Sequence, residues 1–285
     1  MIQQAVDIGE ILMHHTADAY SLDFPPFGTI SWQRWPDVRL GPLTLNLTPT
    51  KHVIFLGLAA LLVFLTMRLA GRQLEKQRAS ERAPTGFANA IEALVLWVRN
   101  DVAITNIGHD GAKFAPFIMA LFFFILYSNL LGLLPWGATP TGNIAVTGGL
   151  AIMALLVIEI SGMRKLGTKG YLRTIFPVIP GMGGAAAAGL SVAMAPIELL
   201  GKLIKPFALC VRLFGNMTAG HFVILSLFGL IFLFGHLDYW RVGIGAASAA
   251  LVLGIMLLEI IVGFVQAYVF SLITAVLIGI NQHEH

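Results

Sequence analysis

Polar and ionisable residues interrupt two long apolar runs in the last third of the chain. These residues are Glu198, Lys202, Lys205, Arg212, His221, Glu259 and Gln266. Ionisable side chains in apolar surroundings are costly, and they mark ion paths or water-filled cavities by default. Any one of them alone could equally be a satisfied structural pair. Their regular spacing favours a shared function.

The spacing places several of these side chains on one helix face. Glu198, Lys205 and Arg212 follow one another at intervals of seven residues, and Asn216 lies four residues further on. Seven residues nearly complete two helical turns, so these side chains form one stripe. The second run carries a similar stripe, which begins at Glu259 and includes a glutamine seven residues later.

Folding the two runs into an antiparallel hairpin brings specific residues together. For a turn at Asp238–Arg241, Arg212 lies opposite Gln266 and His221 lies opposite Glu259. An imidazole beside a carboxylate can pass a proton near neutral pH. His221 lies nearer the turn and Arg212 lies deeper. A proton relay that stops before a fixed cation is a half-channel rather than a pore.

Arg212 has no acid at the matching position across the predicted hairpin. A guanidinium stays protonated, and leaving it unpaired in lipid is costly. Two alternatives can satisfy it. Either Glu198 or water pairs with it inside the chain, or its partner is a carboxylate on another subunit. The whole pattern favours the second alternative.

The composition identifies the surroundings of these residues as a membrane. The chain has 285 residues, of which 57% are hydrophobic and 12% are charged, with a net charge of +3. Soluble domains carry about 25% charged residues, so a polytopic membrane protein is predicted. The single cysteine, Cys210, excludes an internal disulfide and a cysteine-based metal site. No cleaved signal peptide is indicated at the N-terminus, and no P-loop string predicts a nucleotide site.

The charge distribution divides the chain into six segments. A basic flank follows the first apolar run, and a basic loop follows the second pair of spans. By the positive-inside rule, the N-terminus lies outside and the C-terminus in the cytoplasm. The predicted segments are an outer N-terminal segment at 1–51, ordered but irregular; a transmembrane helix at 52–70; a basic cytoplasmic loop with an interfacial amphipathic helix at 71–113; a transmembrane hairpin at 114–161; a cytoplasmic loop at 162–187; and the hairpin that carries the proton path at 188–285.

The predicted fold is therefore all-α, and its last two helices are unusually long. The runs at 188–234 and 242–280 would form helices of about 60 Å, whereas the hydrocarbon core is about 30 Å thick. A steeply tilted antiparallel hairpin resolves the mismatch. Two separate short spans in each run are the alternative.

Four strings resemble subunit a of F-type ATP synthases, over essentially the full length. Residues 205–221 read KPFALCVRLFGNMTAGH, which is highly specific for that family. Supporting strings are LMHHTADAYSLDF at 12–24, NLLGLLP at 129–135 and QAYVFSLITAVLI at 266–278. A secondary transporter would predict an internal repeat, and an intramembrane metalloenzyme an HEXXH string. Neither pattern is found in the sequence.

The resemblance assigns roles to particular residues. It implies that Arg212 is the essential arginine and that Gln266 is its partner. His221 and Glu259 stand where some bacterial members have Glu and His, and this exchange keeps the acid–imidazole pair. The polar residues linked to the proton path are Glu198, Asn216 and Asn129. Two departures from the family pattern are Gly132 and Asn143, which stand where many members have Asp.

The resemblance also implies a mechanism and partners. Protons would enter an outer half-channel, reach a carboxylate on a rotating ring of subunit c, and leave through an inner half-channel near Glu198. Arg212 would separate the two channels. The chain would be a non-catalytic stator subunit without cofactor or metal. It would contact the c-ring, peripheral-stalk subunit b, the remaining ATP synthase subunits and lipid, but no nucleic acid, in a bacterial plasma (inner) membrane.

Overall fold

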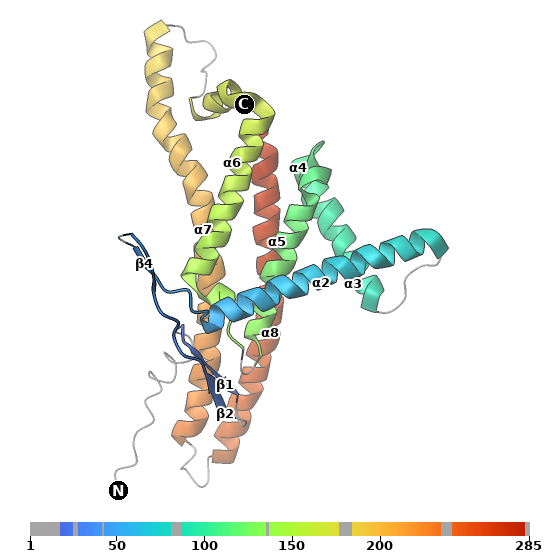
Figure 1. The fold of residues 1–285 in the computed structure, drawn as a ribbon, viewed down its shortest axis with the longest axis vertical. Helices are drawn as coiled ribbons and strands as arrows, with labels where there is room; N and C mark the ends of the chain where they lie inside the picture. The colour runs from blue at the N-terminus through green and yellow to red at the C-terminus, as the bar shows by residue number, and fades with distance from the viewer. Residues whose placement is uncertain are drawn as a thin grey trace. The chain divides into compact units, whose positions relative to one another are not determined.

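The computed structural model describes residues 18–24, 28–41, 43–80, 87–134, 137–176, 184–234 and 241–282 (Figure 1). They fall into two compact units. The first draws on residues 1–63, 124–143 and 213–266, and the second on residues 64–123, 144–212 and 267–285. Each unit is described by itself.

Helices make up most of the described residues. They are α2 Lys51–Ser80, α3 Phe87–Trp97, α4 Thr105–Ile107, α5 Gly111–Gly132, α6 Ile144–Ile175, α7 Gly184–Phe234 and α8 Arg241–Asn281, with a π-helical stretch η1 at Val98–Ile104 and a 3-10 turn η2 at Pro140–Gly142. Five of the helices contain stretches long and apolar enough to cross a membrane. These stretches are Lys51–Arg72, Gly111–Gly132, Ile144–Ile175, Gly189–Leu227 and Gly245–Asn281. The prediction of a polytopic helical membrane protein is confirmed.

The described part of the N-terminal segment, predicted to be ordered but irregular, adds four short strands to the predicted all-α fold. Strands β1 Ser21–Phe24 and β2 Gly28–Ser31 form one antiparallel hairpin, and β3 Val38–Leu40 and β4 Leu43–Leu45 form another. Polar and apolar residues alternate in β1, and this period of two suits a strand. Gly41, which follows β3, has a φ of 64°, a conformation that a glycine adopts without strain.

Two helices run further than the hydrophobic pattern predicted. α2 continues to Ser80 instead of ending near residue 70, because residues 72–80 are mostly good helix formers such as Gln, Leu, Glu and Lys. α6 continues to Ile175, into the predicted loop at 162–187. Its course is interrupted at Gly167, where φ is 70° and ψ is 170°. α6 therefore consists of two helical segments joined at a kink.

α7 and α8 are each continuous, so the alternative of two short spans in each run is not observed. α7 has 51 residues and α8 has 41. Pro196 and Pro206 lie inside α7 without ending it. The polar turn predicted at 235–241 lies outside the described residues, apart from its last position. Within the first unit the two helices lie side by side (Figure 1), as contacts between their side chains also show.

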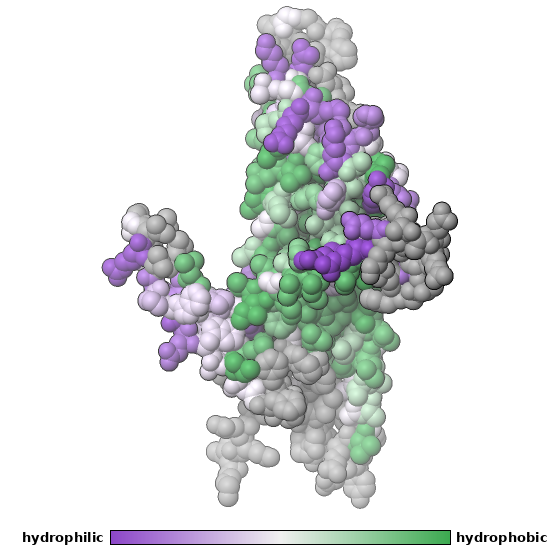
Figure 2. All heavy atoms as spheres, turned by 45° about the vertical axis from the view of Figure 1, so that its right-hand side comes forward, coloured by the Kyte–Doolittle hydropathy of each residue, from purple (hydrophilic) through white to green (hydrophobic). Residues whose placement is uncertain are grey.

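Each unit has its own packed interior. In the first unit, Phe55 and Ala59 of α2 pack with Leu131 and Ala138. In the second, the ring of Trp97 stacks on that of Tyr268 at a centroid distance of 5.2 Å. Large hydrophobic side chains are also exposed along the helices, as the green spheres of Figure 2 show. Such a surface suits contact with lipid.

Candidate functional site

The centre of the site in the first unit is a contact between an imidazole and a carboxylate. Nδ1 of His221 on α7 lies 3.1 Å from Oε1 of Glu259 on α8. The side chain of Glu259 is 5% exposed and that of His221 is 24% exposed. The hairpin register derived from the sequence predicted this contact. The contact is at ion-pair distance, and neither carboxylate oxygen of Glu259 has a hydrogen-bond partner among the described residues.

Both ring nitrogens of His221 are in contact with polar groups. Nδ1 also lies 3.0 Å from the carbonyl oxygen of Met217, one helical turn earlier. Nε2 lies 2.9 Å from Oγ1 of Thr139 and 3.1 Å from the carbonyl oxygen of Gly132. The imidazole therefore connects a hydroxyl at Nε2 with a carboxylate at Nδ1. Such an arrangement can receive a proton at one nitrogen while releasing one from the other.

Two glycines make this close packing possible. A Cβ atom at position 220 would lie 2.8 Å from Oε1 of Glu259. A Cβ atom at position 132 would lie 1.6 Å from Oγ1 of Thr139. Because these positions carry no side chain, the Glu259 carboxylate and the Thr139 hydroxyl can both lie against the backbone beside His221.

Asn129 joins three segments of the first unit. Its Nδ2 donates to the carbonyl of Gly263 at 3.1 Å, and its Oδ1 accepts a hydrogen bond from Thr141 at 2.7 Å. The side chain is 1% exposed. Asn129, from the end of α5, thus binds both α8 and the turn η2. These contacts hold the segment that carries Thr139 against α5 and α8.

The predicted stripe on α7 is exposed. Glu198, Lys205, Arg212 and Asn216 are all exposed residues. In the first unit, Nδ2 of Asn216 donates to Oε1 of Gln266 at 3.2 Å, so this amide pair lies one to two turns along the hairpin from His221. The proximity of Arg212 to Gln266 stays a prediction.

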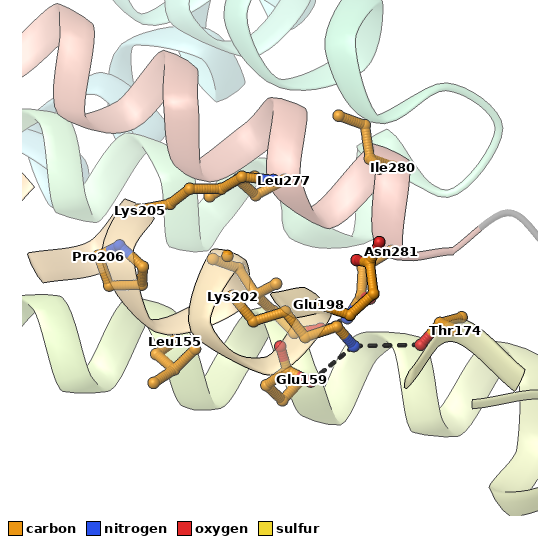
Figure 3. A pocket seen from close by; sticks show the side chains of 12 residues that line it. Leu155, Glu159, Thr174, Glu198, Lys202, Lys205, Pro206, Leu277, Ile280 and Asn281 are labelled. Carbon is orange, nitrogen blue, oxygen red and sulfur yellow. Dashed lines mark hydrogen bonds and ion pairs between the residues drawn. The ribbon is translucent and has the colours of Figure 1, made fainter. Parts of the chain in front are cut away.

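In the second unit, a pocket of about 110 Å³ is lined by Glu198, Lys202 and Lys205 of α7, together with Glu159 and Thr174 of α6 (Figure 3). The remaining lining residues are Leu155, Ile158, Gly201, Pro206, Leu277, Ile280 and Asn281. A cavity of this volume has room for several water molecules. It therefore offers a hydrated place beside Glu198.

The ammonium of Lys202 is held by three partners at this pocket. Nζ lies 3.6 Å from Oε2 of Glu159 and donates to Oγ1 of Thr174 at 3.1 Å, as the dashed lines of Figure 3 mark. It also lies 4.3 Å from the ring centroid of Tyr171, whose hydroxyl donates to Glu159. The cation and the carboxylate are largely buried, with 16% and 18% of their side chains exposed.

A separate ion-pair cluster lies before the start of α5. Asp110 accepts hydrogen bonds from Lys113 at 2.7 Å and from Lys165 at 2.5 Å. These two lysines lower the pKa of the Asp110 carboxyl to about 2. The cluster ties the start of α5 to α6 within the second unit.

Several polar partners at these sites were missed from the sequence. Thr139 and Thr141 lie in an uncharged turn and carried no signal of their own. Glu159, in contrast, lies inside the apolar run predicted at 143–161, where an acid is unusual. An acid at that position could have indicated that Glu159 pairs with a cation such as Lys202.

Comparison with known proteins places the chain in a family. The family model described as ATP synthase A chain matches residues 48–279. The chain is 44% identical to ATP synthase subunit a of Chloroherpeton thalassium over 94% of this chain and 75% of that protein. It is 42% identical to ATP synthase subunit a 2 of Chlorobaculum tepidum over 95% of this chain and 72% of that protein. It is 40% identical to ATP synthase subunit a of Anaeromyxobacter dehalogenans over 98% of this chain and 71% of that protein. These matches and the five membrane-length apolar helices show that the chain belongs to the ATP synthase A chain family, as an integral, multi-pass membrane component of an ATP synthase.

Proposed function

We propose that this chain is the stator subunit that couples proton flow to rotation in the membrane sector of a rotary ATP synthase. The contact between His221 and Glu259 is the observation that supports the proposal most directly. It joins a buried carboxylate to a partly buried imidazole inside a membrane-length hairpin, where an unused ionisable pair would be costly. The relatives are named subunit a of ATP synthase, which agrees with a non-catalytic role in the complex.

The outer half-channel of this proposal ends at the His221–Glu259 pair. A proton that arrives at Nε2 of His221 allows Nδ1 to release its own proton to Glu259, 3.1 Å away. Glu259 then passes the proton to a carboxylate on an adjoining ring of c subunits. Asn129 supports this path by fixing the segments around His221, and Asn216 with Gln266 extends the polar surface along the hairpin.

The inner half-channel of this proposal begins at the pocket beside Glu198. The pocket volume of about 110 Å³ and its polar lining favour hydration. Glu198 accepts the proton that the ring carboxylate releases, and the water-filled pocket carries it to the cytoplasm.

Arg212 is the proposed barrier between the two paths. Its guanidinium keeps its charge, attracts the deprotonated ring carboxylate and repels protons that would leak from one path to the other. A driving force of 100 mV is worth about 2.3 kcal/mol per charge, and a leak would waste it. Exposure of Arg212 on α7 is compatible with a carboxylate partner on a neighbouring subunit.

The surroundings of the subunit complete the proposal. Besides the c-ring, it contacts peripheral-stalk subunit b and the lipid of a bacterial plasma membrane, with its N-terminus outside and its C-terminus in the cytoplasm. α7 and α8 are tilted steeply along the ring. Upright helices of 51 and 41 residues would extend well beyond a hydrocarbon core of about 30 Å.

The test is the substitution Arg212→Ala in the assembled complex. We expect ATP-driven proton pumping into membrane vesicles to be abolished, while the subunits still co-purify. The matched control is Arg164→Ala, which removes an exposed arginine of α6 and should leave pumping unchanged. Normal pumping by assembled Arg212→Ala complexes would refute the proposed mechanism.

A further inference from the structure

The hydroxyl of Thr139 lies at the ring nitrogen of His221 that does not face Glu259. Oγ1 of Thr139 is 2.9 Å from Nε2, whereas Oε1 of Glu259 is 3.1 Å from Nδ1. Thr139 is 5% exposed and stands at the start of the turn η2, which the contacts of Asn129 hold in place. The three side chains thus form one line of polar contacts through the imidazole.

The two groups at Nε2 differ in what they can do. The carbonyl of Gly132 only accepts hydrogen bonds, so it can bind Nε2 only when this nitrogen carries a proton. A hydroxyl both donates and accepts, so Thr139 can bind Nε2 in either state. Among the partners that the described residues give to Nε2, Thr139 is therefore the one able to supply a proton.

We propose that Thr139 is a proton-transfer residue of this subunit, which exchanges protons with Nε2 of His221 on the side opposite Glu259. This inference rests on the proposed function, because it extends the same relay by one residue. Thr139 would connect the imidazole to water in the outer half-channel.

The transfer balances without any ionised hydroxyl. The Thr139 O–H bond breaks as its proton forms a bond to Nε2, and at the same time a hydronium ion in the outer half-channel gives a proton to Oγ1. Nδ1 of the ring then releases its proton to a carboxylate oxygen of Glu259. Threonine ends as it began, one water molecule is left behind, and one proton has moved from the aqueous side to Glu259. The imidazole is left as its Nε2–H tautomer, and it must return to the Nδ1–H tautomer before the next transfer.

Gly132 is required for this arrangement. A Cβ atom at position 132 would lie 1.6 Å from Oγ1 of Thr139 and 2.7 Å from its Cβ atom. The second distance involves an atom next to the backbone, so rotation of the side chain alone cannot relieve the overlap. Any side chain at position 132 therefore displaces the Thr139 hydroxyl from Nε2.

The experiment measures passive proton conduction through membranes stripped of the catalytic head, with the complete membrane sector in place. Thr139→Val keeps the shape of the side chain but removes the hydroxyl, and we expect conduction to fall about 100-fold, the lower end of what a positioned proton-transfer group contributes. Thr139→Ser restores the hydroxyl and should conduct within about threefold of the unmodified complex. This rescue would not occur if Thr139 served only to fill space.

Two further variants make the test decisive. Thr218→Val removes a buried threonine hydroxyl of α7 that has no hydrogen-bond partner among the described residues, and it should leave conduction unchanged. His221→Ala should abolish conduction. If His221→Ala is inactive while Thr139→Val conducts normally, the role of Thr139 is wrong and the proposed function stands. If Thr139→Ser is as inactive as Thr139→Val, the hydroxyl is not the essential feature. Normal conduction by His221→Ala would overturn the relay itself, and with it the proposed outer half-channel.

Discussion

Gly220→Ala tests whether proton transfer depends on the distance between His221 and Glu259. The added methyl group would lie 2.8 Å from Oε1 of Glu259, whereas ordinary contacts of a Cβ atom begin at 3.4 Å. The carboxylate must therefore move by about 0.6 Å, the difference between these two distances. A carboxylate at the end of a flexible side chain can make this shift, so the helices should stay folded.

The size of the functional effect follows from that shift. Oε1 lies 3.1 Å from Nδ1 of His221, and a displacement directed away from the ring lengthens this distance to about 3.7 Å. At that length the two atoms are beyond hydrogen-bonding distance. Because a misplacement of about 1 Å can cost about 100-fold in rate, a shift of about 0.6 Å should lower proton conduction about tenfold.

The assay is passive proton conduction in vesicles stripped of the catalytic head, normalised to the amount of assembled membrane sector. The matched control is Gly254→Ala on α8, where an added Cβ atom meets nothing within 4 Å. We expect the control to conduct normally. If Gly220→Ala also conducts normally in assembled complexes, the direct contact between His221 and Glu259 is not needed for transfer.

Three further predictions concern stability and the relay. Lys202→Met leaves the largely buried Glu159 carboxylate without its cation and should lower the free energy of unfolding by about 1–3 kcal/mol, less than for a fully buried pair. Adding Glu159→Gln should recover part of this loss in thermal unfolding in detergent; equal melting temperatures for all variants would contradict the pairing. The pKa of Asp110 is lowered from 3.8 to about 2, so the stability that its ion pairs contribute is present above pH 3.8 and is lost as the pH falls toward 2. Asp110→Asn should therefore show a weaker loss of stability over that range in acid-induced unfolding, and an unchanged pH dependence would refute this assignment. The double variant His221→Glu with Glu259→His should retain more proton conduction than either single variant, because each single variant places two carboxylates or two imidazoles together. A double variant that conducts no better than the less active single variant would argue against a shared relay.

The hairpin register could be predicted from the sequence because ionisable residues are rare in its apolar runs. An ionisable side chain in an apolar run is costly unless it has a polar partner, so such residues on two paired helices are expected to lie opposite one another. With the turn placed between the two runs, this condition put His221 opposite Glu259. The same reasoning predicted five membrane-length helices, since long apolar runs have few other stable arrangements.

The neighbours of that pair could not be predicted in this way. Thr139 reaches His221 because Gly132 leaves space and because Asn129 fixes the intervening turn through Thr141. These are packing relations between segments that are distant in sequence, and neither threonine nor glycine stands out by charge or hydropathy. The two β-hairpins were missed for a related reason, because strands of three or four residues give too short a pattern to recognise.

The interruption of α6 at Gly167 has a consequence for how the chain matches the thickness of a bilayer. Residues 144–166 before the interruption span about 35 Å as a helix, close to one hydrocarbon core of about 30 Å. The residues around and beyond the interruption include Arg164, Lys165, Lys169 and Arg173, whose charges favour the polar headgroup region over lipid. Gly167 therefore lets the backbone turn where the apolar stretch ends, and the following residues turn back so that Tyr171 reaches Glu159. A substitution such as Gly167→Val would strain this left-handed backbone. We expect it to weaken the contact between Tyr171 and Glu159, because the chain could no longer turn back at this position.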